Sequence, residues 1–306
     1  LLHGRDIMKA LKIIISLLLT APILFFSCTD GYFADKAIDA AIYPRINEMA
    51  AIWADAQAAN AVPVAEMEPE VEAEPEYYHL DVGSNHEEWD SLLTKNNEVI
   101  GWISIPGLID GYPVVLRNDP ETGNEYYLHR SLSGSYSAKG TIFMDFRCSV
   151  EPGYMTQNMT LYGHHQRNGE MFGNLRELKK ISGIKKWPII QFDTLYEEAN
   201  YLIFAVFITN TLEKHGEIFD YRNPNFNTQE EFLEFIEQCR KRSFYNMPVD
   251  VQADDTIITL STCSYEYDEF RLVVMGRKVR AGEESTVHVS EITENPNILY
   301  PDVWYR

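Results

Sequence analysis

Eight short segments of strand-forming residues follow one another between residues 99 and 279, and this pattern restricts the fold more than any other feature of the chain. Each segment is four to nine residues long, is rich in β-branched or aromatic side chains and is bounded by turn residues. Spacings of this kind predict a mainly β fold with a closed or nearly closed barrel. The segments are residues 99–105, 112–116, 140–145, 159–162, 189–192, 201–209, 256–262 and 271–279.

One helix is predicted at residues 228–242, between the strand segments at residues 201–209 and 256–262. Thr228 and Glu231 have the spacing of a capping box at its start. Apolar residues then recur at helical spacing on one face from Phe232 to Cys239. Cys239 is therefore expected to be a buried core residue and not a reactive one.

The N-terminal segment has the pattern of a membrane-targeting sequence. Lys9 and Lys12 precede an uncharged run of 16 residues from Ile13 to Cys28. Together with the residues just before it, this run is long enough to cross a bilayer as a helix, and the preceding basic residues place its N-terminus inside the cell. We predict a signal-anchor, a transmembrane segment, in residues 1–30. A cleaved signal peptide and a lipoprotein signal that uses Cys28 remain open.

A spacer separates this segment from the folded domain. Residues 31–86 contain an alanine-rich, helix-forming part and then prolines with six glutamates at alternate positions from Glu66 to Glu76. Like charges at this spacing repel one another and extend the chain. The folded domain is predicted at residues 87–282 and a C-terminal tail at residues 283–306. All three readings of the N-terminus place the domain outside the cytoplasm, and the signal-anchor predicts a single-pass protein of the cell membrane with its domain on the extracellular face.

Charge and cysteine content argue against several classes of protein. The chain has 46 acidic and 26 basic residues and a net charge of −20, so it repels phosphate backbones and no nucleic-acid partner is predicted. Its four cysteines are too few for a disulfide scaffold. They form no CxxC pair and no cysteine–histidine pair at zinc-ligand spacing, so no metal site is predicted.

A cysteine at the end of a predicted strand is the candidate nucleophile. Cys263 ends the sequence Thr-Leu-Ser-Thr-Cys, and Arg271 begins the next predicted strand eight residues later. If the two strands pair as a hairpin, Cys263 and Arg271 lie opposite each other at its loop end, whereas Arg277 faces Ile257, about 20 Å away. A neighbouring cation favours the thiolate, which is the nucleophilic form. Taken alone, the motif would also suit a cysteine that only packs at the strand end.

A second motif supplies a proton carrier. Residues 161–165, Leu-Tyr-Gly-His-His, form a predicted strand end followed by two histidines, and Met171-Phe172 comes shortly afterwards. A histidine can accept and donate a proton near neutral pH, although a lone histidine more often has a structural role. Cysteine, histidine and arginine at three strand ends are the residue types that acyl transfer needs.

In this combination the motifs resemble those of sortases, the cysteine transpeptidases of Gram-positive cell surfaces. The sequence Thr-Leu-Ser-Thr-Cys263 with Arg271 matches the TLxTC…R signature of the family. The sequence Tyr-Gly-His-His165, followed by Met-Phe172, is similar to the corresponding motif of class B sortases, as are residues 99–103, 112–115 and 140–145. The similarity extends from about residue 87 to residue 278 and implies a closed sortase-type β-barrel with peripheral helices.

The resemblance also implies a role for individual residues. Cys263 corresponds to the nucleophile of the family, His164 to its general acid and base, and Arg271 to the arginine that holds the substrate and stabilises the oxyanion. Ser261 and Thr262 precede the cysteine and are expected to bind substrate. The family needs no metal or organic cofactor.

The implied reaction is cleavage of a C-terminal sorting signal on a secreted protein through a Cys263 thioester, and transfer of the acyl group to an amine of a peptidoglycan precursor. Water in place of the amine would give slow hydrolysis, the activity of a thiol protease. His165 is the less favoured catalytic histidine, because it would face the opposite side of an extended segment. Two alternatives remain open: a pilin-type sortase that joins subunits through a lysine, and a non-catalytic surface protein that uses its β-barrel for binding.

Overall fold

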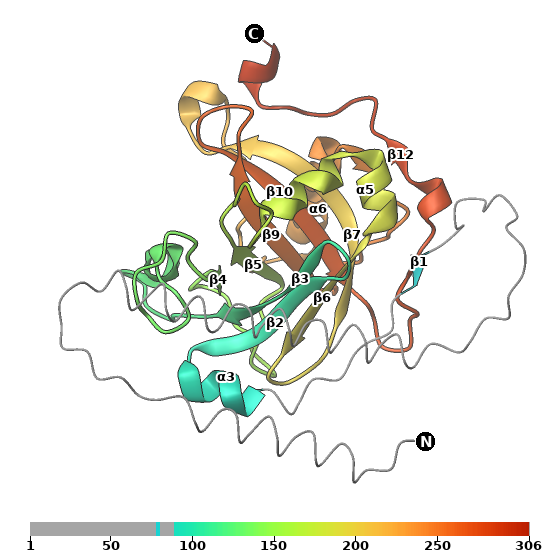
Figure 1. Cartoon of the computed structure of the whole chain (residues 1–306). Coiled ribbons are helices and arrows are strands. Elements are labelled where there is room, and N and C mark those ends of the chain that lie inside the picture. The colour runs from blue at the N-terminus through green and yellow to red at the C-terminus, as the bar shows by residue number, and fades with distance from the viewer. Residues whose placement is uncertain (1–77, 80–88, 306) are drawn as a thin grey trace, which may run out of the picture. The chain divides into compact units, whose positions relative to one another are not determined.

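A closed barrel of eight strands forms the centre of the computed structural model, which describes residues 78–79 and 89–305 (Figure 1). Around the barrel the strands are hydrogen-bonded in the order β10-β7-β6-β2-β3-β4-β5-β9. Each strand overlaps one predicted segment, so the mainly β barrel is confirmed. The strands are β2 (Val99–Ile105), β3 (Ile109–Val115), β4 (Ile142–Met144), β5 (Asn158–Tyr162), β6 (Ile189–Thr194), β7 (Asn200–Asn210), β9 (Ile257–Ser264) and β10 (Phe270–Lys278).

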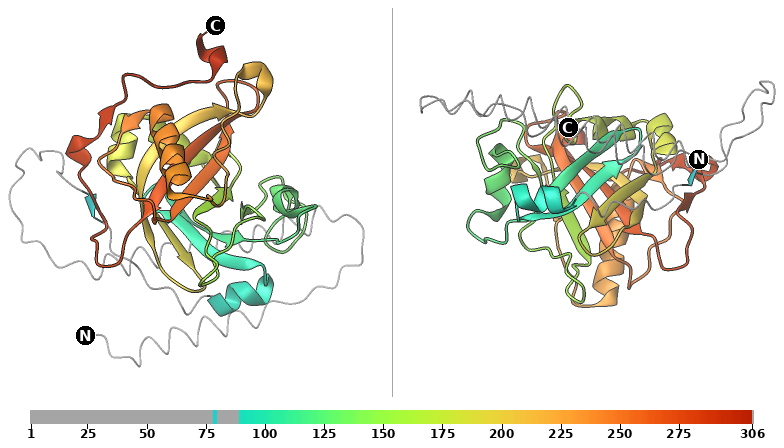
Figure 2. Two further views of the ribbon diagram at one scale, coloured as in Figure 1. Left: turned by 180° about the vertical axis from the view of Figure 1, so that it is seen from behind. Right: turned by 60° about the horizontal axis from the view of Figure 1, so that its bottom comes forward.

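The predicted helix is present as α6 (Gln229–Arg242) and lies against the outside of the barrel, where it is the orange helix of Figure 2. Thr228 caps it, because the Thr228 hydroxyl accepts a hydrogen bond of 3.1 Å from the main-chain N–H of Glu231. Its apolar face is buried, and Cys239 is fully buried as predicted. This helix explains why every residue of β7 is buried: one face of the strand lines the barrel and the other is covered from outside.

Short helices, 3₁₀ turns and one short strand connect the strands of the barrel. Those between the main strands are α3 (Trp89–Lys95), α4 (Gly123–Tyr126), η2 (Tyr127–His129), η3 (Gly173–Lys179), α5 (Ile181–Lys186), η4 (Glu213–His215) and β8 (Tyr245–Asn246). No helix within the described ranges is both long and apolar enough to cross a membrane. The predicted signal-anchor at residues 1–30 lies outside the described residues, as does most of the predicted spacer at residues 31–86.

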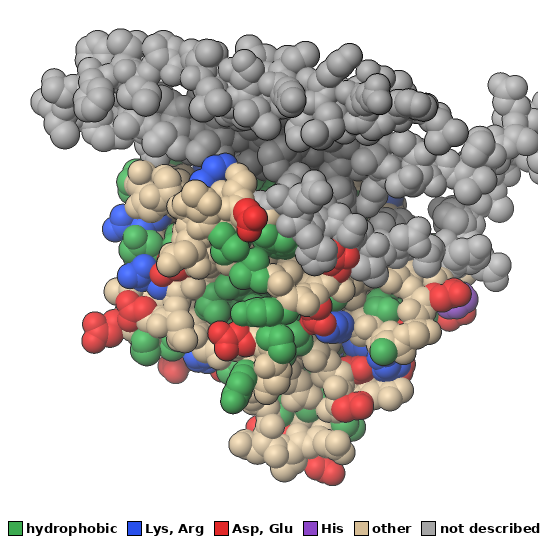
Figure 3. Space-filling model, turned by 90° about the horizontal axis from the view of Figure 1, so that it is seen from below, with side chains coloured by type: hydrophobic (Ala, Val, Ile, Leu, Met, Phe, Trp, Pro, Cys, Tyr) green, Lys and Arg blue, Asp and Glu red, His purple; other side chains and the backbone are tan. Residues whose placement is uncertain are grey.

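Part of that spacer and the predicted tail pair with other segments. Tyr78–His79 forms the strand β1, which pairs with β11 (Thr286–Val287). Further along, β12 (Thr293–Glu294) pairs with β8. Two 3₁₀ turns, η5 (Val289–Glu291) and η6 (Asp302–Tyr305), complete the C-terminal segment. On the face shown in Figure 3, acidic and basic side chains are interspersed around a group of hydrophobic ones.

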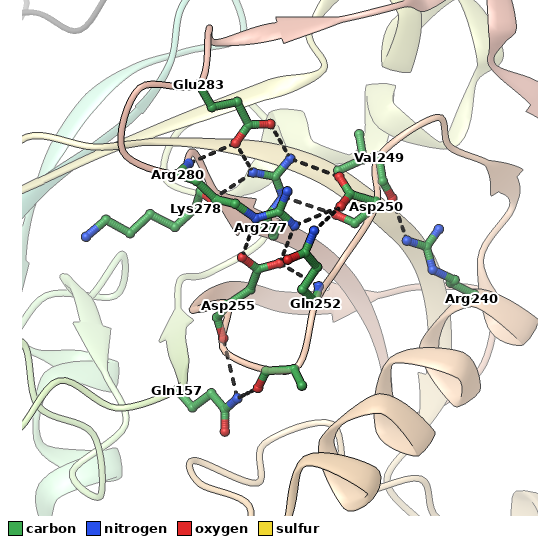
Figure 4. Close-up of polar contacts among 11 residues, drawn as sticks. Gln157, Arg240, Val249, Asp250, Gln252, Asp255, Arg277, Lys278, Arg280 and Glu283 are labelled. Atoms are coloured by element: carbon green, nitrogen blue, oxygen red, sulfur yellow. Dashed lines mark hydrogen bonds and ion pairs between the residues drawn. The ribbon is translucent and has the colours of Figure 1, made fainter.

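A network of charged side chains lies beside the far end of β10, around Arg277 (Figure 4). The Arg277 side chain is only 1% exposed and forms an ion pair with Glu283, with 2.7 Å between Nη2 and Oε1. Its Nη2 also lies 3.6 Å from a carboxylate oxygen of Asp250. Arg280 also forms ion pairs, because its Nη2 lies 2.9 Å from Oδ2 of Asp250 and 2.7 Å from Oδ2 of Asp255. The network links the end of β10 to the loop that leads into β9.

Candidate active site

The β9–β10 hairpin holds the candidate nucleophile opposite an arginine. In its antiparallel register Cys263 pairs with Arg271, and Arg277 pairs with Ile257, as the spacing predicts. Directly opposed residues on antiparallel strands project from the same face of a sheet, so the thiol and the guanidinium share one surface. Cys263 is partly exposed, whereas the other described cysteines, Cys148 and Cys239, are buried.

The strand on the other side of β9 brings the histidines to the same end of the barrel. β5 runs parallel to β9, and Tyr162 lies beside Ser261. The ladder continues one step beyond the strand, because the N–H of Gly163 donates to the Ser261 carbonyl at 3.2 Å. His164 is the next residue after Gly163. Arg271, Cys263 and His164 therefore lie on or directly after three neighbouring strands, β10, β9 and β5, at the same end of the barrel (Figure 1).

The Met-Phe half of the histidine motif closes the loop that presents His164. The N–H of Phe172 donates to the His164 carbonyl at 3.0 Å, and His165 pairs with Met171 as an isolated bridge. Met171 and Phe172 are both buried. A Cβ atom at Gly163 would lie 2.7 Å from the Phe172 ring, so only glycine fits at the turn before the histidine. The conformation of this loop thus depends on residues at both ends of the motif.

His164 faces the segment between β3 and β4. Its Nε2 atom is 2.6 Å from the Leu128 carbonyl oxygen, and its ring stacks on that of His129 with 5.5 Å between centroids. A carbonyl can only accept a hydrogen bond, so Nε2 carries a proton and donates it. In the neutral ring the lone pair is then on Nδ1, which is the atom free to exchange a proton.

His165 has different partners from His164, as their alternation along the chain suggests. Its Nδ1 atom lies 2.8 Å from the main-chain carbonyl oxygen of Cys263. The Tyr265 hydroxyl donates to the His165 carbonyl at 3.0 Å, and the two rings are 4.7 Å apart. The sequence gives no indication of this link, because Tyr265 belongs to no motif and lies 100 positions from His165.

Arg271 is held by its own loop. Its Nη2 donates to a carboxylate oxygen of Glu269 at 2.8 Å and its Nη1 to the Phe270 carbonyl at 3.2 Å. Burial acts to lower the pKa of Arg271, but the hydrogen bond to Glu269 and the proximity of Cys263 outweigh it, so the pKa of Arg271 is raised and the side chain stays charged. Glu269 has a left-handed backbone with φ of 57°, an uncommon conformation for a residue other than glycine. Sequence reasoning missed Glu269.

The two residues expected to bind substrate are both buried, each 2% exposed. Ser261 lies on the same face as Cys263, and its hydroxyl is 2.8 Å from that of Tyr221. Thr262 points to the opposite face, and its hydroxyl is buried without a hydrogen-bond partner in the described part of the chain. Tyr221, which the sequence did not single out, therefore covers Ser261 from the segment before α6.

A buried carboxylate supports the strand that leads to His164. The Tyr162 hydroxyl donates to Asp145 at 2.8 Å, and Asn124 donates to the same oxygen at 3.0 Å. Arg147 binds Asp145 through two N–H groups, at 2.8 and 2.9 Å. Burial acts to raise the pKa of Asp145, but these hydrogen bonds lower it overall, so the carboxylate is ionised. Asp145 comes from the predicted strand at residues 140–145.

A closed barrel with cysteine, histidine and arginine at three adjacent strand ends defines a cysteine transpeptidase of the β-barrel type. The sequence model of the sortase domain matches residues 118–279. Sortase B of Staphylococcus aureus (strain NCTC 8325 / PS 47) is 31% identical over an alignment of 204 residues that covers 64% of this chain and 79% of that protein. The chain belongs to the sortase family, in its class B.

Solved structures agree with this assignment. The structure of a Staphylococcus aureus sortase B–substrate complex is 30% identical, with a TM-score of 0.57, and the match covers 64% of this chain and 87% of that one. A crystal structure of sortase B from B. anthracis is also 30% identical, with a TM-score of 0.56, and the match covers 67% and 90% of the two chains. The resemblance inferred from the motifs is confirmed, and the chain is a cysteine transpeptidase.

Proposed function

We propose that this transpeptidase cleaves a C-terminal sorting signal on secreted proteins and transfers the acyl group to an amine of a peptidoglycan precursor. The observation that carries the proposal is the pairing of Cys263 with Arg271 on adjacent strands, next to the strand end that bears His164. The similar Staphylococcus aureus sortase B has been solved as a complex with substrate, which supports substrate binding by this chain as well.

In the first half of the reaction, the Cys263 thiolate attacks the carbonyl carbon of the scissile peptide bond. The tetrahedral oxyanion collapses, the C–N bond breaks, and the His164 imidazolium gives its proton to the leaving amine. The products are a Cys263 thioester and a neutral His164. The Nε2–H bond to the Leu128 carbonyl supports this role, because it leaves Nδ1 to carry the transferred proton.

In the second half, an acceptor amine loses a proton to His164 and attacks the thioester carbonyl. The C–S bond then breaks, and the thiolate and the imidazolium are restored with no net consumption of protons. No oxidant, metal or organic cofactor enters these steps. Water as the acceptor would give hydrolysis instead.

Arg271 is proposed to stabilise the oxyanion in both halves of the reaction. A single donor at such a position contributes about 3 kcal/mol to transition-state stabilisation. Its guanidinium has five N–H donors, and the two contacts with Glu269 and Phe270 leave others for a substrate oxygen. Ser261 is proposed to contact substrate once the Tyr221 side chain moves away from it. Thr262, whose side chain lies on the opposite face of β9, is proposed to shape the site indirectly.

The proposed location is the outer face of the cell membrane, with the protein held by a single N-terminal span. The basic residues Lys9 and Lys12 before the uncharged run, and the acidic spacer after it, support this arrangement. Secreted proteins that carry sorting signals, peptidoglycan precursors and the cytoplasmic membrane are then the partners of the chain.

A panel of fluorogenic sorting-signal peptides, with and without an amine acceptor, tests the proposal. We expect mass spectrometry to find an acyl adduct on Cys263 that is absent in the Cys263→Ala variant and is resolved faster by amine than by water. The absence of an adduct with every peptide, together with an unreactive Cys263, would contradict it and favour a binding barrel. Multimers of a substrate linked through lysine would instead favour a pilin-type sortase.

A further inference from the structure

The hydrogen-bond ladder between β5 and β9 ends one step before the nucleophile. Its last main-chain bond runs from the N–H of Gly163 to the Ser261 carbonyl, at 3.2 Å. In a parallel pair, the next acceptor would be the Cys263 carbonyl and its donor the N–H of residue 165, since successive bonds are two residues apart. The chain turns away at His164 instead and enters the loop that returns at Phe172.

The His165 imidazole takes the place of that missing main-chain donor. Nδ1 lies 2.8 Å from the Cys263 carbonyl oxygen, which can only accept, so Nδ1–H donates to it. A main-chain carbonyl at the end of a ladder needs a partner when it is shielded from water. The side chain satisfies this need, and the main chain is left free to form the loop that carries His164.

Tyr265 forms a second link in the opposite direction. Its hydroxyl donates to the His165 carbonyl at 3.0 Å, and the two rings are 4.7 Å apart. Tyr265 is two residues beyond Cys263, so the segment that carries the nucleophile is linked to His165 at two points, through the Cys263 carbonyl and through the Tyr265 hydroxyl. The Tyr265 side chain is itself 63% exposed, which shows that it is not held there by burial in the core.

We propose that His165 is a positioning residue for transpeptidation: it fixes the main chain of Cys263, while the neighbouring His164 carries the proton. The proposal rests on the proposed function, because it takes Cys263 as the nucleophile. In this role His165 acts through the Cys263 carbonyl and not on the reacting atoms. A displacement of about 1 Å in a reacting group can cost about 100-fold in rate, so a fixed cysteine main chain has a measurable effect.

The variants His165→Asn and His165→Ala of the full chain test this role. The amide Nδ2 of asparagine is as many bonds from Cβ as Nδ1 of histidine, so Asn can keep the donor that Ala removes. One readout is the rate at which iodoacetamide alkylates Cys263 across about pH 5 to 9, followed by mass spectrometry of the peptide that contains it. The other is kcat and KM with a sorting-signal peptide that the wild-type chain turns over.

We expect His165→Ala to lower kcat about 10- to 100-fold with less than a threefold change in KM, and His165→Asn to recover kcat to within about threefold of wild type. The pH midpoints of alkylation and turnover should be the same in all three proteins, because His164 is unchanged. Wild-type kcat in His165→Ala, or equal losses in the two variants, would overturn the proposal. So would the loss of one limb of the pH profile, because His165 would then be the proton carrier.

A third variant keeps the test decisive if His165→Ala does not fold. Tyr265→Phe removes only the hydroxyl that binds the His165 carbonyl, and we expect it to lower kcat about three- to tenfold. The proposal would be overturned if Tyr265→Phe had an unchanged kcat and His165→Asn did not recover kcat. If the wild-type chain itself forms no Cys263 adduct, the proposed function fails, whereas an active wild type with an unaffected His165→Ala variant refutes only the positioning role.

Discussion

The two ends of the β9–β10 hairpin carry the same kind of side chain in opposite surroundings. Arg277 is 1% exposed and is closed in by Glu283 and Asp250 (Figure 4). Arg271, six residues earlier on the same strand, is 25% exposed, and its carboxylate partner is the half-exposed Glu269. Nothing in the residue type separates them. The comparison teaches that a satisfied arginine stabilises a fold, whereas an arginine with unused donors beside a cysteine is available for a substrate.

The largest expected effect is on turnover, at the end of the hairpin that carries Arg271. The variant Arg271→Ala should have a kcat/KM about 100- to 1,000-fold lower, because the proposed oxyanion donor is lost, while the free energy of unfolding changes little. Peptide turnover and urea unfolding of the same preparation measure the two quantities. If Arg271→Ala lost stability but kept its turnover per folded molecule, Arg271 would be a structural residue and the contrast with Arg277 would be wrong.

The matched change at the other end, where Arg277 lies, should lower stability instead of turnover. Arg277→Ala leaves Glu283 and Asp250 without their buried partner, and we expect it to lower the free energy of unfolding by about 3 kcal/mol. This is the lower part of the range for a broken buried ion pair, since Glu283 is 28% exposed and Asp250 is 59% exposed and keeps its ion pair with Arg280. Turnover per folded molecule should remain within about twofold of wild type. A large loss of turnover would mean that the far network affects catalysis.

The smallest expected effect is the pH dependence of the stability that the Arg277–Glu283 ion pair contributes. The hydrogen bond from Arg277 lowers the pKa of Glu283 below its ordinary value of 4.5. The unfolded carboxylate then takes up a proton before the folded one, so this contribution to stability is complete above pH 4.5 and is lost as the pH falls through the lower folded pKa. Glu283→Gln should therefore flatten the decline in the urea midpoint between about pH 6 and 3.

The exposed neighbour Glu284 provides the control for this titration. Glu284→Gln removes the same type of charge one position further along, at an exposed residue. We expect its urea midpoint to follow the wild-type decline with pH. An equal flattening in both variants would attribute the pH dependence to overall charge and not to the Arg277 ion pair.

The strands, the capped helix and the Cys263–Arg271 pairing could be predicted from the sequence. Each depends on residues close together in the chain: Thr228 caps a helix that starts at the next residue, and Cys263 and Arg271 are joined by a single hairpin. The pairing of Tyr78–His79 with β11 was not foreseen, because two residues inside an acidic spacer carry no strand pattern. The predicted membrane span remains a prediction.

What the sequence by itself determined is therefore the family, the barrel and the residue types of the site. Only the tertiary structure decided which atoms meet: His164 Nε2 with the Leu128 carbonyl, His165 Nδ1 with the Cys263 carbonyl, and the Tyr221 hydroxyl with that of Ser261. These partners are 36, 98 and 40 positions apart. The register of a hairpin is set by its own turn and side-chain pattern, whereas side-chain hydrogen bonds between distant segments depend on how the whole barrel closes.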